Sequence, residues 1–327
     1  MNQLAEKIIG GYRFKDVDEL LATAENTPRE ELYEACHEIT RKVMGDGFDT
    51  CSIINVKSGN CPEDCAWCTQ SAHYRTDSEV HGVLPVEKVR DQALFNESKG
   101  IGRFSLVASG KRPNSRENAE YGEMFDAIRA HGGKINLCAS LGLATREQLQ
   151  ALKDAGCTTY HCNMESAPSY FPTLVSTHTQ EQKEETLRNA RAVGMRACSG
   201  GIIGMGETRR QRAEFALYLA SLGIGSIPIN FLHPMAGTPL GARKPLDDDE
   251  LLFSVCLFRL ANPGAYLRFS GGRALYGSDT QRKALYIGIN AAITGDLLTT
   301  RASVTESDMR LFAEAGYDTG KETTWAK

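Results

Sequence analysis

The chain has 327 residues, a net charge of −4 and an isoelectric point near 6.0. The small acidic excess argues against a protein that binds mainly to a nucleic-acid backbone, because such binding needs a basic face. No apolar run reaches the roughly 18 residues that a membrane span requires, and the segment Met1–Asp16 lacks the apolar centre of a signal peptide. We therefore expect a cytoplasmic enzyme that binds neither nucleic acid nor a membrane.

The first 45 residues predict helices, with amphipathic patterns over Glu19–Thr23 and Arg29–Met44. From Cys51 onward, short apolar or β-branched runs alternate with amphipathic segments of about 10–15 residues, which is typical of a parallel sheet. The candidate strands are Cys51–Val56, Arg103–Ala108, Lys134–Ala139, Thr158–Asn163, Arg196–Gly201, Ser226–Phe231, Tyr266–Ser270 and Ile289–Ile293.

Eight alternating units within about 250 residues predict a (β/α)8 TIM-type barrel, although a doubly wound sheet would produce similar local patterns. Thr305–Ala315 predicts a helix that closes the barrel. We expect residues 1–45 to form an N-terminal helical extension and residues 46–327 to form the barrel domain. Capping boxes are expected at Thr145, Thr179 and Ser278, because each is followed three residues later by glutamine.

Three of the ten cysteines, Cys61, Cys65 and Cys68, stand within eight residues directly after the first candidate strand. In a reducing compartment, clustered cysteines more often bind metal or do chemistry than form disulfides. Their C-x3-C-x2-C spacing suits three irons of a [4Fe–4S] cluster and leaves the fourth iron open to a small molecule. Structural zinc is disfavoured because no second C-x2-C or C-x2-H lies nearby, and the polar loop disfavours three unrelated core cysteines.

This spacing resembles the radical S-adenosylmethionine (SAM) superfamily. The resemblance implies that the amino and carboxylate groups of SAM chelate the open iron, and that an electron from the cluster cleaves SAM to a 5′-deoxyadenosyl radical. Trp67 stands where members of the superfamily pack a ring near the adenine, and a flat π face suits a purine. A loop that follows a strand is also where barrel enzymes place their active sites.

Further segments resemble the biotin synthase family within that superfamily. They occur in order along the chain and are Gly59–Cys65, Cys198–Thr208, Ile227–Asn230 with Gly237–Leu240, and Arg268–Arg273. The resemblance implies that dethiobiotin is converted to biotin with two SAM-derived radicals. It also implies that the inserted sulfur comes from an auxiliary iron–sulfur cluster, which is [2Fe–2S] in the family.

Strand positions predict where the auxiliary cluster lies. Cys138, Cys198 and Arg268 fall on three candidate strands whose side chains can converge inside a barrel. A lone interior cysteine is usually part of the core. Two cysteines with an arginine fit a second cluster better, because a buried arginine needs a negative partner and an anionic cluster would provide one.

One position departs from the family pattern, because Ser105 stands where the family has the third cysteine of this cluster. Three outcomes are open: Ser105 binds iron as an alkoxide, Cys162 replaces it, or the cluster is of another type with an extra sulfide or an outside ligand. Strand alternation weakens the case for Cys162, because it points outward if Asn163 and Glu165 face inward, unless a bulge re-aims it. Cys51 is interpreted as a core or surface cysteine.

The resemblance assigns SAM binding to Asn163, Glu165, Lys183 and Ile202, in addition to the tryptophan. Glu165 replaces an aspartate of the family near the ribose, so the carboxylate is kept with one more methylene. Lys183 replaces an arginine, so the charge is kept but the planar fork is lost. Ile202, in a glycine-rich segment, offers an apolar surface to the adenine.

Substrate contacts are expected from Asn230, whose amide offers a donor and an acceptor to the cyclic urea of dethiobiotin, and from His161. His161 could equally be a satisfied interior histidine. The resemblance also implies a flavodoxin or ferredoxin as electron donor and a homodimer. Two alternatives remain: another radical SAM barrel enzyme, such as a hydrogenase maturase or methylornithine synthase, and a non-enzymatic metal-binding protein.

Overall fold

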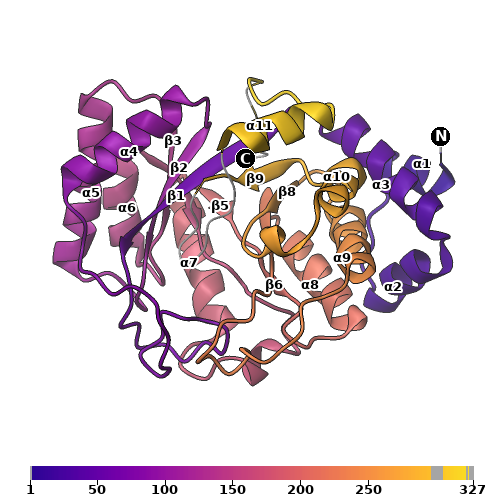
Figure 1. Ribbon diagram of the computed structural model, residues 1–327, viewed down its shortest axis with the longest axis horizontal. Helices are drawn as coiled ribbons and strands as arrows, with labels where there is room; N and C mark the ends of the chain where they lie inside the picture. The colour runs from indigo at the N-terminus through magenta and orange to yellow at the C-terminus, as the bar shows by residue number, and fades with distance from the viewer. Residues whose placement is uncertain (1, 296–304, 322, 324–327) are drawn as a thin grey trace.

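The computed structural model describes residues 2–295, 305–321 and 323. In this part of the chain, parallel strands follow the order β5-β4-β3-β2-β1-β9-β8-β7-β6, and a pairing between β5 and β7 closes the ring (Figure 1). The strands are β1 (Asp49–Lys57), β2 (Arg103–Ala108), β3 (Asn136–Ser140), β4 (Cys157–His161), β5 (Arg196–Cys198), β6 (Gly201–Ile203), β7 (Ser226–Phe231), β8 (Tyr266–Phe269) and β9 (Ala291–Ile293). This closed ring confirms the predicted barrel and excludes the doubly wound sheet.

The strand predicted over Arg196–Gly201 is interrupted at Ser199 and Gly200, so that β5 ends at Cys198 and a separate strand, β6, begins at Gly201. At Gly200 the backbone approaches β7 so closely that a Cβ atom there would lie 1.9 Å from the carbonyl oxygen of Pro228. Only glycine fits at such an approach. The interruption brings the residues that follow β4 next to the start of β6, where Glu165 pairs with Gly201.

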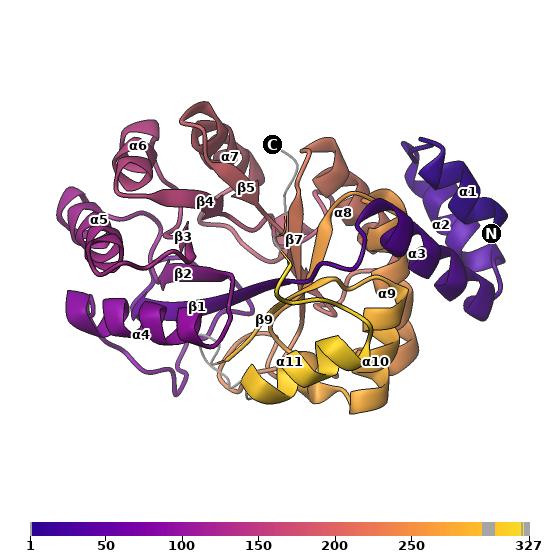
Figure 2. The same ribbon diagram turned by 90° about the horizontal axis from the view of Figure 1, so that it is seen from above.

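Helices cover the outside of the ring, and Figure 2 shows them arranged around it from above. They are α4 (Val86–Ser98), α5 (Ser115–Ala130), α6 (Arg146–Asp154), α7 (Gln180–Ala192), α8 (Arg209–Ser221), α9 (Asp248–Ala261) and α10 (Ser278–Ile287), with short 3₁₀ turns η1 (Phe171–Thr173) and η2 (Arg273–Leu275). The predicted capping boxes at Thr145 and Thr179 are confirmed. The one at Ser278 is wrong, because Gly277 occupies the cap position and Ser278 is already helical.

Three helices precede the barrel and lie together at one side of it (Figure 2). They are α1 (Gln3–Ile9), α2 (Val17–Asn26) and α3 (Arg29–Val43), and they pack against α8, α9 and α10. The predicted closing helix is α11 (Thr305–Glu314), whose Phe312 stacks on Phe48 at a ring-centroid distance of 4.1 Å, just before β1. No helix of the described residues has both the length and the apolar character needed to cross a membrane.

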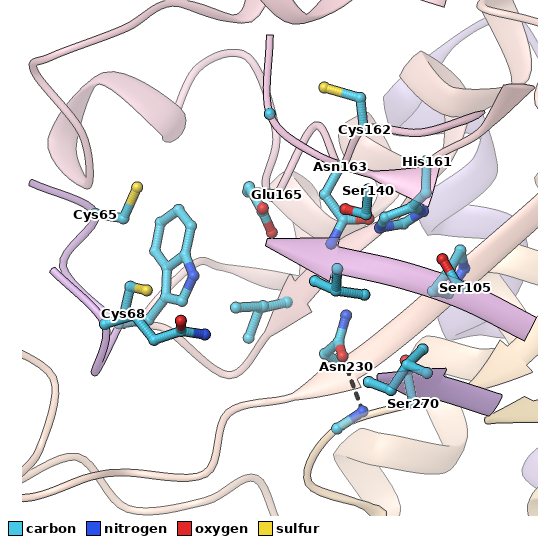
Figure 3. A pocket seen from close by; sticks show the side chains of 18 of the residues that line it. Cys65, Cys68, Ser105, Ser140, His161, Cys162, Asn163, Glu165, Asn230 and Ser270 are labelled. Carbon is cyan, nitrogen blue, oxygen red and sulfur yellow. Dashed lines mark hydrogen bonds between the residues drawn. The ribbon is translucent and has the colours of Figure 1, made fainter. Parts of the chain in front are cut away.

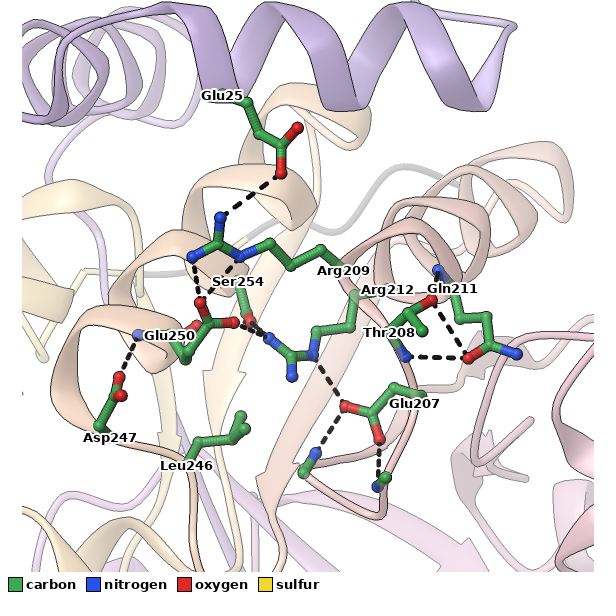
Figure 4. Close-up of polar contacts among 12 residues, drawn as sticks. Glu25, Glu207, Thr208, Arg209, Gln211, Arg212, Leu246, Asp247, Glu250 and Ser254 are labelled. Atoms are coloured by element: carbon green, nitrogen blue, oxygen red, sulfur yellow. Dashed lines mark hydrogen bonds and ion pairs between the residues drawn. The ribbon is translucent and has the colours of Figure 1, made fainter.

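A buried polar network joins α2, α8 and α9 to the loop after β6 (Figure 4). Arg212 donates to Glu207 at 2.8 Å and to Glu250 at 2.6 Å, and Arg209 pairs with both Glu250 and Glu25. Glu207 also accepts the backbone N–H of Gly204 at 2.7 Å. The network therefore fixes the glycine-rich turn that borders the interior of the barrel.

Candidate active site

A cavity of about 450 Å³ opens inside the barrel, within the size range of small-molecule sites. Its walls are alternate residues of the strands, such as Cys51 and Ile53 of β1, together with the loop that follows β1. All the residues predicted to function line it: Cys61, Cys65, Trp67, Cys68, Ser105, Cys138, His161, Cys162, Asn163, Glu165, Lys183, Cys198, Ile202, Asn230 and Arg268. Their individual roles stay predictions, but the barrel brings the whole set to one space (Figure 3).

The cysteine loop is half-buried and rests on an apolar wall. Cys65 and Trp67 pack against a buried group of side chains that includes Phe171 and Leu174. Burial raises the pKa of the Cys68 thiol to about 11 and raises that of Cys65 further. A bound metal would favour the thiolate instead, because its positive charge stabilises the deprotonated sulfur.

The geometry of the cysteine loop fits a cluster better than a single ion. Within the described residues, no three His, Cys, Asp or Glu side chains converge as one metal ion requires. A cluster needs a different arrangement, because each thiolate binds its own iron. Thiols alone, held separately on one loop around the cavity, are the donor set expected for iron–sulfur chemistry.

Two carboxylates inside the cysteine motif hold the loop in place. Asp64 accepts hydrogen bonds from the backbone N–H groups of Ser176 at 3.0 Å and Thr177 at 3.2 Å. Burial alone would raise the pKa of Asp64, but the hydrogen bonds from Ser176 and Thr177 outweigh it and hold the pKa well below its usual range. Glu63 accepts from the Thr177 hydroxyl at 2.8 Å and pairs with His178. Sequence reasoning missed Thr177 and His178, because they lie more than a hundred positions away and meet the motif only in the fold.

Glu165 combines an unusual backbone conformation with a buried carboxyl group beside the cavity. Its φ of 69° lies in the left-handed region, and its N–H and C=O bond to Gly200 and Ile202 at 3.0 and 2.8 Å. Burial raises the pKa of Glu165, and the nearby Lys183 charge opposes that rise. The buried Oε2 atom has no hydrogen-bond partner in the described part of the chain. A buried unpaired carboxylate oxygen facing a cavity fits a ligand with hydroxyl groups, such as a ribose.

The base of the cavity holds a buried carboxylate that pairs with two arginines. Arg268 donates to the Asp49 carboxylate and to its backbone oxygen at 2.9 Å, and Arg103 donates to the same carboxylate at 2.8 Å. Burial acts to raise the pKa of Asp49, but the two arginines lower it to about 2. Arg268 therefore does not need a cluster to balance its charge, which corrects the reasoning from sequence. The charges of both arginines act on Cys138, and that of Arg268 also acts on Cys198, so the thiolate form of each is favoured electrostatically.

His161 and Asn230 lie on facing parts of the wall (Figure 3). The Nδ1 atom of His161 is 3.3 Å from Sγ of Cys198, and burial lowers the His161 pKa to about 4, so the ring is neutral at pH 7. Asn230 donates to the Gly201 carbonyl at 3.0 Å and accepts the Gly271 N–H at 2.8 Å. The Asn230 amide thus bridges β6 to the loop after β8, and one N–H and one lone pair remain for a substrate.

Two family models match the chain. That of the Radical SAM superfamily matches residues 55–219, and that of the Biotin and Thiamin Synthesis associated domain matches residues 228–318. A biotin synthase of Porphyromonas gingivalis is 58% identical over 94% of this chain and 93% of the relative, and one of Parabacteroides distasonis is 51% identical over 100% and 99%. This chain belongs to the biotin synthase family.

Solved structures add support for the fold alone. Methylornithine synthase superposes with a TM-score of 0.83 at 17% identity and covers 97% of both chains. A maturase of FeFe-hydrogenase from Carboxydothermus hydrogenoformans gives a TM-score of 0.79 at 15% identity, over 96% of this chain and 78% of the other. The two enzyme classes that were open alternatives share this barrel, and the high identities above place the chain with the biotin synthases.

Ser105, where a departure from the family pattern is expected from sequence, lies within the cavity wall. Ser105 of β2 is the register partner of Cys138 on β3 and of Ile53 on β1. Cys162 follows β4 and belongs to the apolar core, and its thiol points away from Ser140 and His161 in Figure 3. The charges that act on Cys162 are those of Lys183 and Glu165, not those at the cavity base. Cys162 also borders the cavity, so its role stays a prediction.

Proposed function

We propose that this member of the biotin synthase family converts dethiobiotin to biotin as a radical SAM sulfurtransferase. The observation that carries the proposal is the single cavity with thiols at two levels. Cys61, Cys65 and Cys68 stand at its mouth, and Cys138 and Cys198 stand among the strands near its base. Sulfur insertion at a carbon needs a radical source and a sulfur source on either side of one substrate, and this arrangement fits that need.

The cysteine loop would hold a [4Fe–4S] cluster, which supplies the electron that cleaves SAM to a 5′-deoxyadenosyl radical. Trp67, Asn163 and Ile202 would face the nucleoside of SAM, and Glu165 would accept from its hydroxyl groups. Lys183 stays charged, because burial lowers its pKa but Cys162 and Glu165 raise it more. A charged lysine in this position suits the carboxylate of SAM.

The substrate would lie between the two levels of thiols. Asn230 has one donor and one acceptor free for the cyclic urea, and neutral His161 offers a second polar contact without adding charge. Walls of strand residues exclude water from the reacting carbons, so that the radical meets only the substrate. The auxiliary cluster at Cys138, Cys198 and Arg268 would supply the sulfur.

We further propose a reduced flavodoxin or ferredoxin as electron donor, a homodimer and a cytoplasmic location, as the family resemblance implies. Residues 1–45 would act as a helical extension of the barrel domain at 46–327. The half-buried position of the cysteine loop supports an electron donor that docks at the mouth of the cavity.

An anaerobic assay tests the proposed function. Reconstituted protein, a reductant, SAM and dethiobiotin should give both 5′-deoxyadenosine and biotin. A parallel reaction without dethiobiotin is the control and should give no biotin and less 5′-deoxyadenosine. Formation of 5′-deoxyadenosine that does not respond to dethiobiotin, without any biotin, would contradict the proposal.

A further inference from the structure

The third residue of β1, Cys51, faces the interior of the barrel together with Ile53 two positions later. Cys51 is buried, as the core interpretation from sequence predicts, and it also borders the cavity, with 8% of the residue exposed. Its thiol makes a weak hydrogen bond of 3.5 Å to the carbonyl of Ser52. Within the described residues, Cys51 therefore reaches the cavity as a thiol without a strong hydrogen-bond partner for its sulfur.

Cys51 lies in the same charged surroundings as Cys138 and Cys198. Burial raises the pKa of all three thiols, and the charge of Arg268 acts against that rise at each of them. Both Cys51 and Cys198 also interact electrostatically with Cys138. Ser226 adds a contact, because its hydroxyl lies 3.6 Å from Sγ of Cys198 and 3.5 Å from Arg268. Three thiols that line one cavity thus lie within reach of the charge of the same buried arginine.

The other two candidates for the third ligand fit less well. Ser105 lies at the level of Cys138, but its oxygen is a hard and weak ligand for iron compared with a thiolate. Cys162 has a suitable sulfur and borders the cavity, but it belongs to the apolar core. The charges that act on it are those of Lys183 and Glu165 rather than that of Arg268. Cys51 combines a soft sulfur donor with a position near Arg268 and Cys138. It lies on the same inward face of β1 as Ile53, two residues earlier, and Ile53 is the register partner of Ser105.

We propose that Cys51 supplies the third thiolate of the auxiliary iron–sulfur cluster, together with Cys138 and Cys198 and beside Arg268. The thiolate that the family resemblance expects on β2 at position 105 is thereby moved to the neighbouring strand β1. Each thiol releases its proton to solvent as it binds iron. This assignment rests on the proposed function, which requires an auxiliary cluster in the first place.

The test compares iron and sulfide content after anaerobic reconstitution of the full chain. Wild type should bind more than the roughly four irons of a [4Fe–4S] cluster. Cys51→Ala should lose all iron and sulfide above that amount and the matching visible absorption, as Cys138→Ala does. Ser105→Ala and Cys162→Ala should keep the wild-type content. Because Cys51→Ala removes a buried side chain, Cys51→Ser is measured as well and should show the same loss.

Folding is checked with the electron paramagnetic resonance signal of the reduced [4Fe–4S] cluster and its change on adding SAM, which every variant should keep. The double variant Cys51→Ser with Ser105→Cys should regain the second cluster, because it returns the thiolate to the family position. Wild-type iron and sulfide in Cys51→Ala or Cys51→Ser overturns the assignment of Cys51. Only four irons in wild type instead contradicts the auxiliary cluster of the proposed function, so the two failures can be told apart.

Discussion

Two groups of three cysteines line the cavity, and they are built in different ways. Cys61, Cys65 and Cys68 belong to one loop, so their spacing alone already indicates an iron–sulfur site. Cys51, Cys138 and Cys198 belong to three strands that only the closed barrel brings together. The loop begins beyond the end of β1, roughly 20 Å along the strand from Cys51 at about 3.3 Å per residue.

The comparison shows how one fold separates two kinds of site. The loop at the mouth is held by hydrogen bonds from a distant segment, such as those of Asp64 to Ser176 and Thr177. The base is rigid, because its thiols stand on hydrogen-bonded strands around a buried ion pair. In the proposed function, the site that binds and releases SAM lies on a loop, and the site of the auxiliary cluster lies among strands.

The largest effect is expected from Cys65→Ala, which removes a thiolate from the loop. Formation of 5′-deoxyadenosine should fall to background. This loss exceeds the roughly 10–100-fold loss of activity that follows when a residue that only supports a metal ligand is removed. Product is measured by chromatography after anaerobic reconstitution. Cys36→Ala, which alters a buried cysteine between α3 and α9, is the control and should keep activity. Undiminished cleavage in Cys65→Ala would refute the loop as the cluster site.

The next effect separates the two levels of thiols. Cys198→Ala should stop biotin formation but keep part of the 5′-deoxyadenosine formation, because it removes a thiol from the base and leaves the loop intact. The ratio of the two products in one reaction measures this split. Full biotin formation by Cys198→Ala would exclude a cluster at the base as the sulfur source.

A third prediction concerns the ion pair at the base. Asp49→Leu should lower the free energy of unfolding by about 3–5 kcal/mol, because it removes the carboxylate that two buried arginines share. Arg282→Leu breaks an exposed pair with Glu314 and should cost no more than about 1 kcal/mol. Denaturant unfolding of the metal-free chains measures both. Equal losses in the two variants would show that the base is not a tightly coupled network.

The smallest effect is a pH dependence at His161. Its pKa is lowered to about 4 in the fold from a model-peptide value of 6.5, so the unfolded chain binds the proton more readily between these values. Stability should therefore fall by about 2–3 kcal/mol as the pH drops from 6.5 to 4. His161→Asn should remove this part of the slope, whereas a change at His37, which stacks on Tyr286 at the surface, should not. A slope unchanged in His161→Asn would contradict burial of a neutral ring.

The sequence by itself determined the parallel βα architecture, because alternation between apolar strands and amphipathic helices is a local pattern. The choice of a closed barrel over a doubly wound sheet came from the pairing of strands in the tertiary structure. The sequence also determined the loop motif of Cys61, Cys65 and Cys68, since the ligands of that site are neighbours along the chain. Only tertiary structure decided the role of Asp49 as the partner of two arginines, and it alone brought Cys51 into the cavity. The reason is physical: a strand residue faces its partners only after the ring has closed, and closure joins positions more than two hundred residues apart.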